Sequence, residues 1–184
     1  MSEQPGRYQR STAGLVGAIL ITLAVIIAFV VFRSVFRDQV EQEPDAVDWE
    51  ASVGFAQESG TEIVYPRSVP DSWTATSVDL DPGDPPAWGL GFLTGDTLFV
   101  GLRHEDASLD DLLETYVEEK PVELRELDEQ QLDSEVAPTW QVFEDTGGDR
   151  AYAAEVDDRV VLVYGSAPAA DLELVVERLT TEPR

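Results

Sequence analysis

The sequence predicts an α+β protein, in which an N-terminal transmembrane helix precedes one domain with helices on one face of a mostly antiparallel sheet. Residues 11–32 carry no charge and lie between two pairs of arginines. Further on, two hairpin patterns each lead into an amphipathic helix pattern. Because a parallel sheet needs single strands that alternate with helices, the repeated pattern favours the order α-βββ-α-βββ-α, a duplicated βββα unit.

The uncharged run 11–32 is long enough to cross a membrane. As a helix with a rise of about 1.5 Å per residue it reaches roughly 33 Å, and the hydrocarbon core is about 30 Å thick. A cleaved signal peptide is the alternative, but residues 30–37 read VVFRSVFR and offer no small-residue cleavage site. We therefore expect a retained anchor whose helix continues to residue 37.

The orientation of this anchor is not decided by charge, because two arginines lie near each of its ends. A span so close to the start normally leaves the N-terminus in the cytoplasm and exports the rest of the chain. We thus expect a single-pass protein of the cell membrane. Its expected segments are a tail (1–10), the anchor and juxtamembrane helix (11–37), an acidic linker (38–48) and an exported domain (49–182).

The charge of the chain limits its partners. Only Glu3 among the 37 acidic residues, and four of the 12 basic ones, precede position 38, so the remainder carries a net charge of −28. Such a surface repels nucleic acids and anionic lipid headgroups, so apart from the anchor's contact with the bilayer we expect neither as a partner. The absence of cysteine excludes disulfides and thiol chemistry.

The domain is expected to open with a helix capped by Asp48 and ended near Gly60. An extended segment at 63–66 and a strand at 74–81 come next. The apolar positions of the helix recur at helical spacing: Trp49, Val53 and Ala56.

The first hairpin is expected to join strands 88–93 and 98–103. A two-residue turn at Gly95 and Asp96 would place Phe92 opposite Phe99. Three aromatic side chains then share one face, either as a platform for a ligand or as a buried sheet face. The candidate ligand-binding residues are Trp88, Phe92 and Phe99.

A helix is expected after each hairpin. Ser108 and Asp111 form a capping box at the start of the first helix. The second helix carries Leu172, Val175, Val176 and Leu179. The acidic stretch 118–136 between the halves is expected to be a long connection with at most a short strand at 123–127. The strands of the second half are expected at 139–144, 151–156 and 160–164, the last two joined by a turn at Asp157 and Asp158.

Several of these segments resemble an uncharacterised actinobacterial family, domain of unknown function 4245. The resemblance implies single-pass membrane proteins with one exported domain, and it covers most of residues 10–182. It brings no known activity and no functional residues, and Val69 stands where the family usually has Leu. The segments that carry it are PRSVPDSW (66–73), the hairpin at 88–102, GDR (148–150) and VYGSAP (163–168).

No motif in the sequence predicts catalysis. The single histidine, His104, is expected at the surface, and the patterns of a serine nucleophile are missing. Asp79, Asp81 and Asp84 surround a Pro/Gly turn but lack the closing Glu of a calcium loop, so we expect no structural calcium site. We accordingly predict no catalytic residues, no metal and no cofactor.

Two functions agree with these observations. The first is a non-enzymatic, envelope-associated domain that binds an envelope protein or a small apolar ligand. The alternative is an exported hydrolase that depends on carboxylates or on a cation. A deep pocket that holds two carboxylates of raised pKa would favour the hydrolase.

Overall fold

The computed structural model describes residues 22, 26, 45–81, 83, 85–118 and 120–184. The chain divides into two compact units, 1–43 and 44–184. Thr22 and Ile26 are helical. The other residues of the predicted tail and anchor, and the linker as far as residue 44, lie outside the described residues. Within the described residues, no helix is both long enough and apolar enough to span a bilayer.

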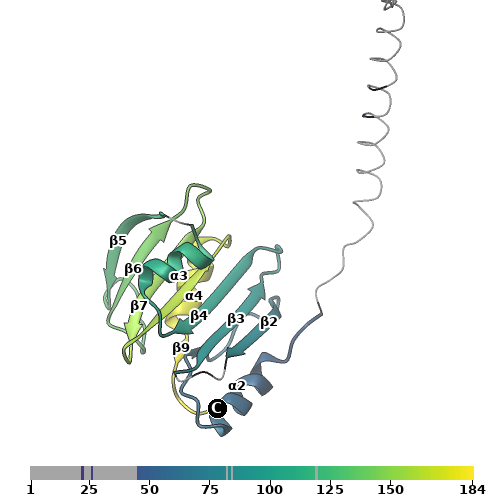
Figure 1. The fold of residues 1–184 in the computed structure, drawn as a ribbon, viewed down its shortest axis with the longest axis vertical. Coiled ribbons are helices and arrows are strands. Elements are labelled where there is room, and N and C mark those ends of the chain that lie inside the picture. The colour runs from purple at the N-terminus through teal and green to yellow at the C-terminus, as the bar shows by residue number, and fades with distance from the viewer. Residues whose placement is uncertain (1–21, 23–25, 27–44, 82, 84, 119) are drawn as a thin grey trace, which may run out of the picture. The chain divides into compact units, whose positions relative to one another are not determined.

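The second unit contains one seven-stranded sheet in which every neighbouring pair is antiparallel (Figure 1). Its strand order is β2-β3-β4-β8-β7-β6-β5, so the two halves of the chain meet where β4 pairs with β8. The predicted α+β class and the single sheet are confirmed. The strands are β2 (Thr74–Asp81), β3 (Ala87–Leu93), β4 (Phe99–Glu105), β5 (Val122–Asp128), β6 (Thr139–Glu144), β7 (Arg150–Val156) and β8 (Arg159–Gly165).

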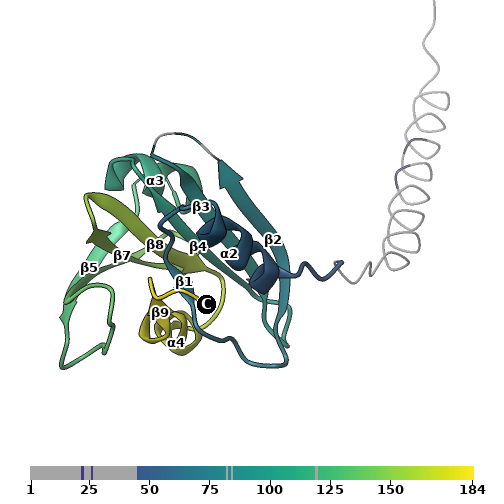
Figure 2. The ribbon, with the colours of Figure 1, turned by 90° about the horizontal axis from the view of Figure 1, so that it is seen from below.

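Helices cover both faces of this sheet, so the prediction that they cover one face was wrong. One face packs on α2 (Trp49–Glu58) and α4 (Ala169–Glu177), and α3 (Leu109–Tyr116) lies on the other (Figure 2). The reason is that β8 is apolar on both sides. Val161 and Val163 belong to the first core, and Val160 and Leu162 belong to the second. Two short strands pair beside α4: β1 (Tyr65–Pro66) and β9 (Leu179–Thr180).

The register of the β3–β4 hairpin differs from the prediction by one residue. Phe92 lies opposite Val100, and Leu93 lies opposite Phe99. The loop has three residues, because Thr97 adopts a positive φ of 60° and Thr94 N–H donates to the carbonyl of Leu98. A type I turn followed by such a left-handed residue is the usual three-residue hairpin loop. A shift of one residue moves every side chain of β4 to the opposite face.

The other local predictions were closer. Asp48 caps α2 by accepting a hydrogen bond from Ala51 N–H at 3.0 Å, and Ser108 caps α3 through Asp111 N–H at 3.2 Å. The β7–β8 turn has two residues, Asp157 and Asp158, both with positive φ. The stretch expected to be mainly a connection contains the seven-residue strand β5, which forms an edge of the sheet.

Candidate functional site

The predicted aromatic stripe does not form. Trp88 and Phe92 are completely buried on the face of α2, where Phe92 packs edge-on against Trp49 at 5.7 Å between ring centroids. Phe99 lies on the opposite face, 5.8 Å from the ring of Tyr164. The two buried rings therefore belong to the core, and the three side chains do not make a common platform.

A polar cluster lies on the α3 face around Arg103. Its guanidinium pairs with Asp79 at 2.7 Å and with Glu105, and it lies 4.8 Å from the ring centroid of Tyr116. The Tyr116 hydroxyl donates to Glu105 at 3.0 Å. Burial, and then this hydrogen bond to Glu105, raises the pKa of Tyr116 to about 12.

The contacts of this cluster hold α3 against the sheet, and they leave few unpaired polar groups for a ligand. Glycines make room for it, since a Cβ at Gly89 would lie 2.4 Å from the Arg103 guanidinium and one at Gly101 would lie 2.6 Å from the Tyr164 ring. Of the predicted acidic turn, Asp79 is engaged by Arg103 and Asp81 accepts from Gly83 N–H at 3.2 Å. Asp84 lies outside the described residues.

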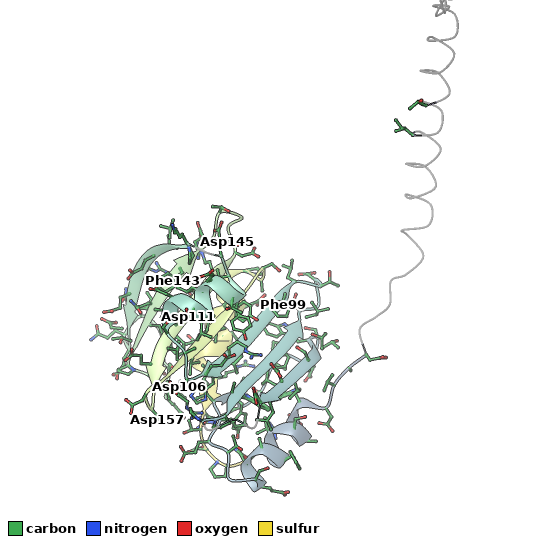
Figure 3. The ribbon with its side chains drawn as sticks, viewed as in Figure 1. Phe99, Asp106, Asp111, Phe143, Asp145 and Asp157 are labelled. Carbon is green, nitrogen blue, oxygen red and sulfur yellow. The ribbon has the colours of Figure 1, made fainter. Side chains whose placement is uncertain are left out.

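A second cluster lies at one end of the sheet, where β8 begins after the β7–β8 turn. Two adjoining cavities of about 610 and 160 Å³ share Glu62, Asp157 and Arg159 as lining residues. We call the pair of spaces the Arg159 cavity, which His104 also lines in its smaller part. Asp106 and Asp157 lie at this end of the sheet, and Phe99 lies at the far end of β4 (Figure 3).

Arg159 is a buried cation that has no carboxylate partner among the residues the structure describes. Only 8% of the residue is exposed, and no acidic group in the described part of the chain forms an ion pair with it. Its guanidinium donates to the carbonyl of Glu62 at 3.1 Å and, more weakly, to that of Pro86 at 3.5 Å. Because a guanidinium has five N–H donors, most of its capacity is unused.

His104 is buried rather than at the surface, so that prediction was wrong. The residue is 1% exposed, and neither ring nitrogen makes a hydrogen bond of normal geometry in the described residues, although the Val156 backbone is close enough to act on the pKa of the ring in the raising direction. Burial, and then the charge of Arg159, lowers the pKa of His104 to about 4. Its neutral ring therefore offers one donor and one acceptor at neutral pH.

The rim of the cavity is acidic. Asp106, Asp157 and Asp158 are exposed and line the larger space together with Glu62. The site thus joins unpaired buried donors to several exposed carboxylates. Chemically it can bind a polar molecule through hydrogen bonds and charge.

The model of a family of proteins of unknown function, DUF4245, matches residues 7–179. The chain belongs to the DUF4245 family. No curated protein matches it.

In this DUF4245 protein, both central residues of the cavity carry a sequence signal that the prediction did not use. His104 follows Val100 and Leu102 at a spacing of two, and all three point to one buried face. Arg159 precedes Val161 and Val163 in the same way. Strand alternation therefore indicates burial at both positions, against the usual surface preference of polar and charged residues.

Proposed function

We propose that this protein is a single-pass membrane protein whose exported, non-enzymatic domain binds a small polar ligand in the Arg159 cavity. One observation carries the proposal: among the described residues, the buried guanidinium of Arg159 has no carboxylate partner, and the buried His104 imidazole that lines the same cavity makes no hydrogen bond of normal geometry. A buried charge left unpaired costs several kcal/mol, so a partner that pairs with it gains affinity.

The polar ligand replaces the small apolar ligand expected from the aromatic stripe. Trp88 and Phe92 are completely buried in the core, and although Trp88 lines a space of about 540 Å³ beside α2, none of its own surface is exposed to a ligand. A purely structural role for Arg159, in which it ties the segments at Glu62 and Pro86 together, would use two of its five donors. The two oxygens of a ligand carboxylate could accept hydrogen bonds from the remaining N–H groups of Arg159, in the bidentate geometry that suits a guanidinium.

The hydrolase remains the alternative, because Asp106, Asp157 and Asp158 line the same cavity. Catalysis that depends on a cation would need carboxylates close enough to share it. Among the described residues, no group of three or more metal-ligating side chains has that arrangement. Release of product from simple ester, amide or glycoside substrates that Asp157→Asn abolishes would favour this alternative.

Binding can be tested on the full chain in phosphatidylcholine nanodiscs by thermal unfolding. The probes are acetate, phosphate, glycine, L-alanine and L-leucine at millimolar concentrations and matched ionic strength. A ligand at about ten times its Kd should raise the melting temperature by roughly 3–5 °C. We expect Arg159→Gln to remove the rise and Arg125→Gln, on the exposed edge strand β5, to leave it intact. If no probe raises the melting temperature of the unaltered protein, the proposed binding function is wrong.

The topology has a separate test. Protease added to intact, wall-stripped cells should degrade the C-terminal domain, because the proposal places it outside the cytoplasmic membrane. Protection of the domain until the membrane is opened would reverse the proposed orientation. A cytoplasmic protein measured in the same samples reports whether the membrane stayed closed.

A further inference from the structure

We infer that the Arg159 cavity binds a zwitterion of the amino-acid type, a small molecule that carries a carboxylate and a cationic amine. The inference rests on the proposed function and specifies its ligand. It follows from the two kinds of unpaired groups that the cavity brings together: buried donors at its base and exposed carboxylates at its rim.

The base of the cavity fits a carboxylate. Arg159 is more than nine-tenths buried, and it is bonded only to two backbone carbonyls in the described residues. His104 also lines the smaller space, and its buried ring nitrogens make no hydrogen bond of normal geometry within the described residues. A carboxylate has two oxygens and accepts from a guanidinium in a bidentate manner, so it matches these donors better than a single hydroxyl does.

The rim fits a cationic amine. Asp106, Asp157 and Asp158 line the larger space and take part in none of the ion pairs of the described chain. The Glu62 side chain is likewise without an ion pair at the boundary of both spaces. An ammonium group with three donors can bind between such carboxylates.

The overall charge distinguishes a zwitterion from a simple anion. The chain from residue 38 onward has a net charge of −28, and four acidic residues line the cavity, so an anion is repelled both at long range and at the rim. A simple cation, in turn, gains nothing from Arg159. A zwitterion is neutral at long range and meets charge of the opposite sign at each of its ends.

The sizes of the two spaces agree with this orientation. Glu62, Asp157 and Arg159 line both spaces, whereas His104 lines only the smaller one, about 160 Å³, and Asp106 and Asp158 line only the larger one, about 610 Å³. A carboxylate at their boundary would leave the amine and a side chain in the larger space. The cavity can therefore accept amino acids that differ in side-chain length.

Calorimetric titration of the full chain in phosphatidylcholine nanodiscs tests the inference with matched probes. L-alanine is compared with propionate, which lacks the amine, and with ethylamine, which lacks the carboxylate. L-leucine is compared in the same way with 4-methylpentanoate and 3-methylbutylamine. We expect at least one amino acid to bind at least tenfold more tightly than both of its analogues.

Substitutions at the rim separate the two ends of the ligand. Asp157→Asn with Asp158→Asn keeps residues that tolerate the positive φ of the turn, so the fold should persist. In this variant we expect the tenfold preference for the amino acid over its deaminated analogue to fall below threefold. The matched control is Asp110→Asn with Asp111→Asn on α3, which should keep the preference.

The outcomes distinguish the inference from the proposed function. If a carboxylate without an amine binds as tightly as the amino acid, or if the rim variant keeps the preference, the cavity binds a ligand but the zwitterion is wrong. If acetate or phosphate binds and neither amino acid does, the zwitterion is again wrong and the proposed function stands. If none of these probes binds, both are contradicted.

Discussion

At the residue scale, the neutral state of His104 makes the stability of the domain depend on pH. Its folded pKa is about 4 and its ordinary value is 6.5, so between these values the unfolded chain binds a proton that the folded chain does not. The stabilisation is therefore complete above pH 6.5 and is lost as the pH falls towards 4. The loss amounts to about 3 kcal/mol. Glu62, Asp157 and Arg159 share the cavity with this ring.

Urea unfolding at pH 7 and pH 4.5 measures this dependence, with His104→Leu as the comparison because the carboxylates also titrate in this range. We expect the free energy of unfolding of the unaltered protein to fall by about 2–3 kcal/mol more than that of the variant. Equal losses in the two proteins would mean that folding does not lower the pKa of His104.

The glycines beneath the Arg103 cluster give a second residue-scale prediction. A Cβ at Gly101 would lie 2.6 Å from the Tyr164 ring and 2.9 Å from Phe99, so Gly101→Ala should lower the free energy of unfolding by about 1–3 kcal/mol. A Cβ at Gly54, in α2, would have no atom within 4 Å. Gly54→Ala should therefore stabilise the protein by about 0.5–1 kcal/mol. Chemical denaturation of both variants checks the pair, and a stabilising Gly101→Ala would contradict the packing described.

Residue environments could be predicted from the sequence only in part. Trp49, Val53 and Ala56 were expected in the core of α2 and are buried there. His104 was expected at the surface from its residue type, although its place after Val100 and Leu102 indicates burial. The ion pair between Asp79 and Arg103 joins residues that are far apart in the sequence, so no local sequence pattern predicts it.

At the element scale, Thr97 determines the register of the β3–β4 hairpin. Its φ of 60° is costly for a residue with a branched side chain, and glycine adopts this conformation without strain. Thr97→Gly should raise the free energy of unfolding by about 0.5–1 kcal/mol. Thr97→Ala should not gain as much, because alanine still carries a Cβ. Urea unfolding of the two variants tests this, and an unstable Thr97→Gly would imply a different loop.

Elements with local signals were predicted best. The capping residues Asp48 and Ser108, and the two-residue turn at Asp157, occur as expected. The β3–β4 loop was not predicted correctly, because a threonine such as Thr97 does not indicate a left-handed backbone. A glycine does, as Gly148 shows in the corresponding loop before β7. Strand β5 was expected only as a short candidate strand at 123–127 within a connection, because only Leu127 of its seven residues is buried and alternation is therefore absent.

At the scale of the whole domain, the pairing of β4 with β8 makes the two halves one sheet, so we expect one unfolding transition. The tryptophans report on each half separately, because Trp140 lies on β6 and the other three precede β4 in the sequence. A variant that keeps only Trp140 and the Trp140→Phe variant should each show a urea transition with the same midpoint as backbone circular dichroism of that variant. Midpoints that differ between fluorescence and circular dichroism would indicate halves that unfold independently.

The class, the order of most elements and the single sheet could be predicted because hairpin and helix patterns repeat along the chain. The face that each helix covers could not be predicted from the sequence. Strand β8 is apolar on both sides, so a helix on either face would satisfy the pattern. The cavity could not be predicted either, since it joins the segment at Glu62, the end of β4 and the β7–β8 turn.

The central claim is that Arg159 holds a ligand carboxylate. A crystal structure of the full chain grown with L-alanine tests it most directly. The account predicts the amino acid in the Arg159 cavity, with its carboxylate within hydrogen-bond distance of the Arg159 guanidinium and its amine near Asp157 or Asp158. A guanidinium paired with one of the protein's own carboxylates, with no amino acid in the cavity, would contradict it.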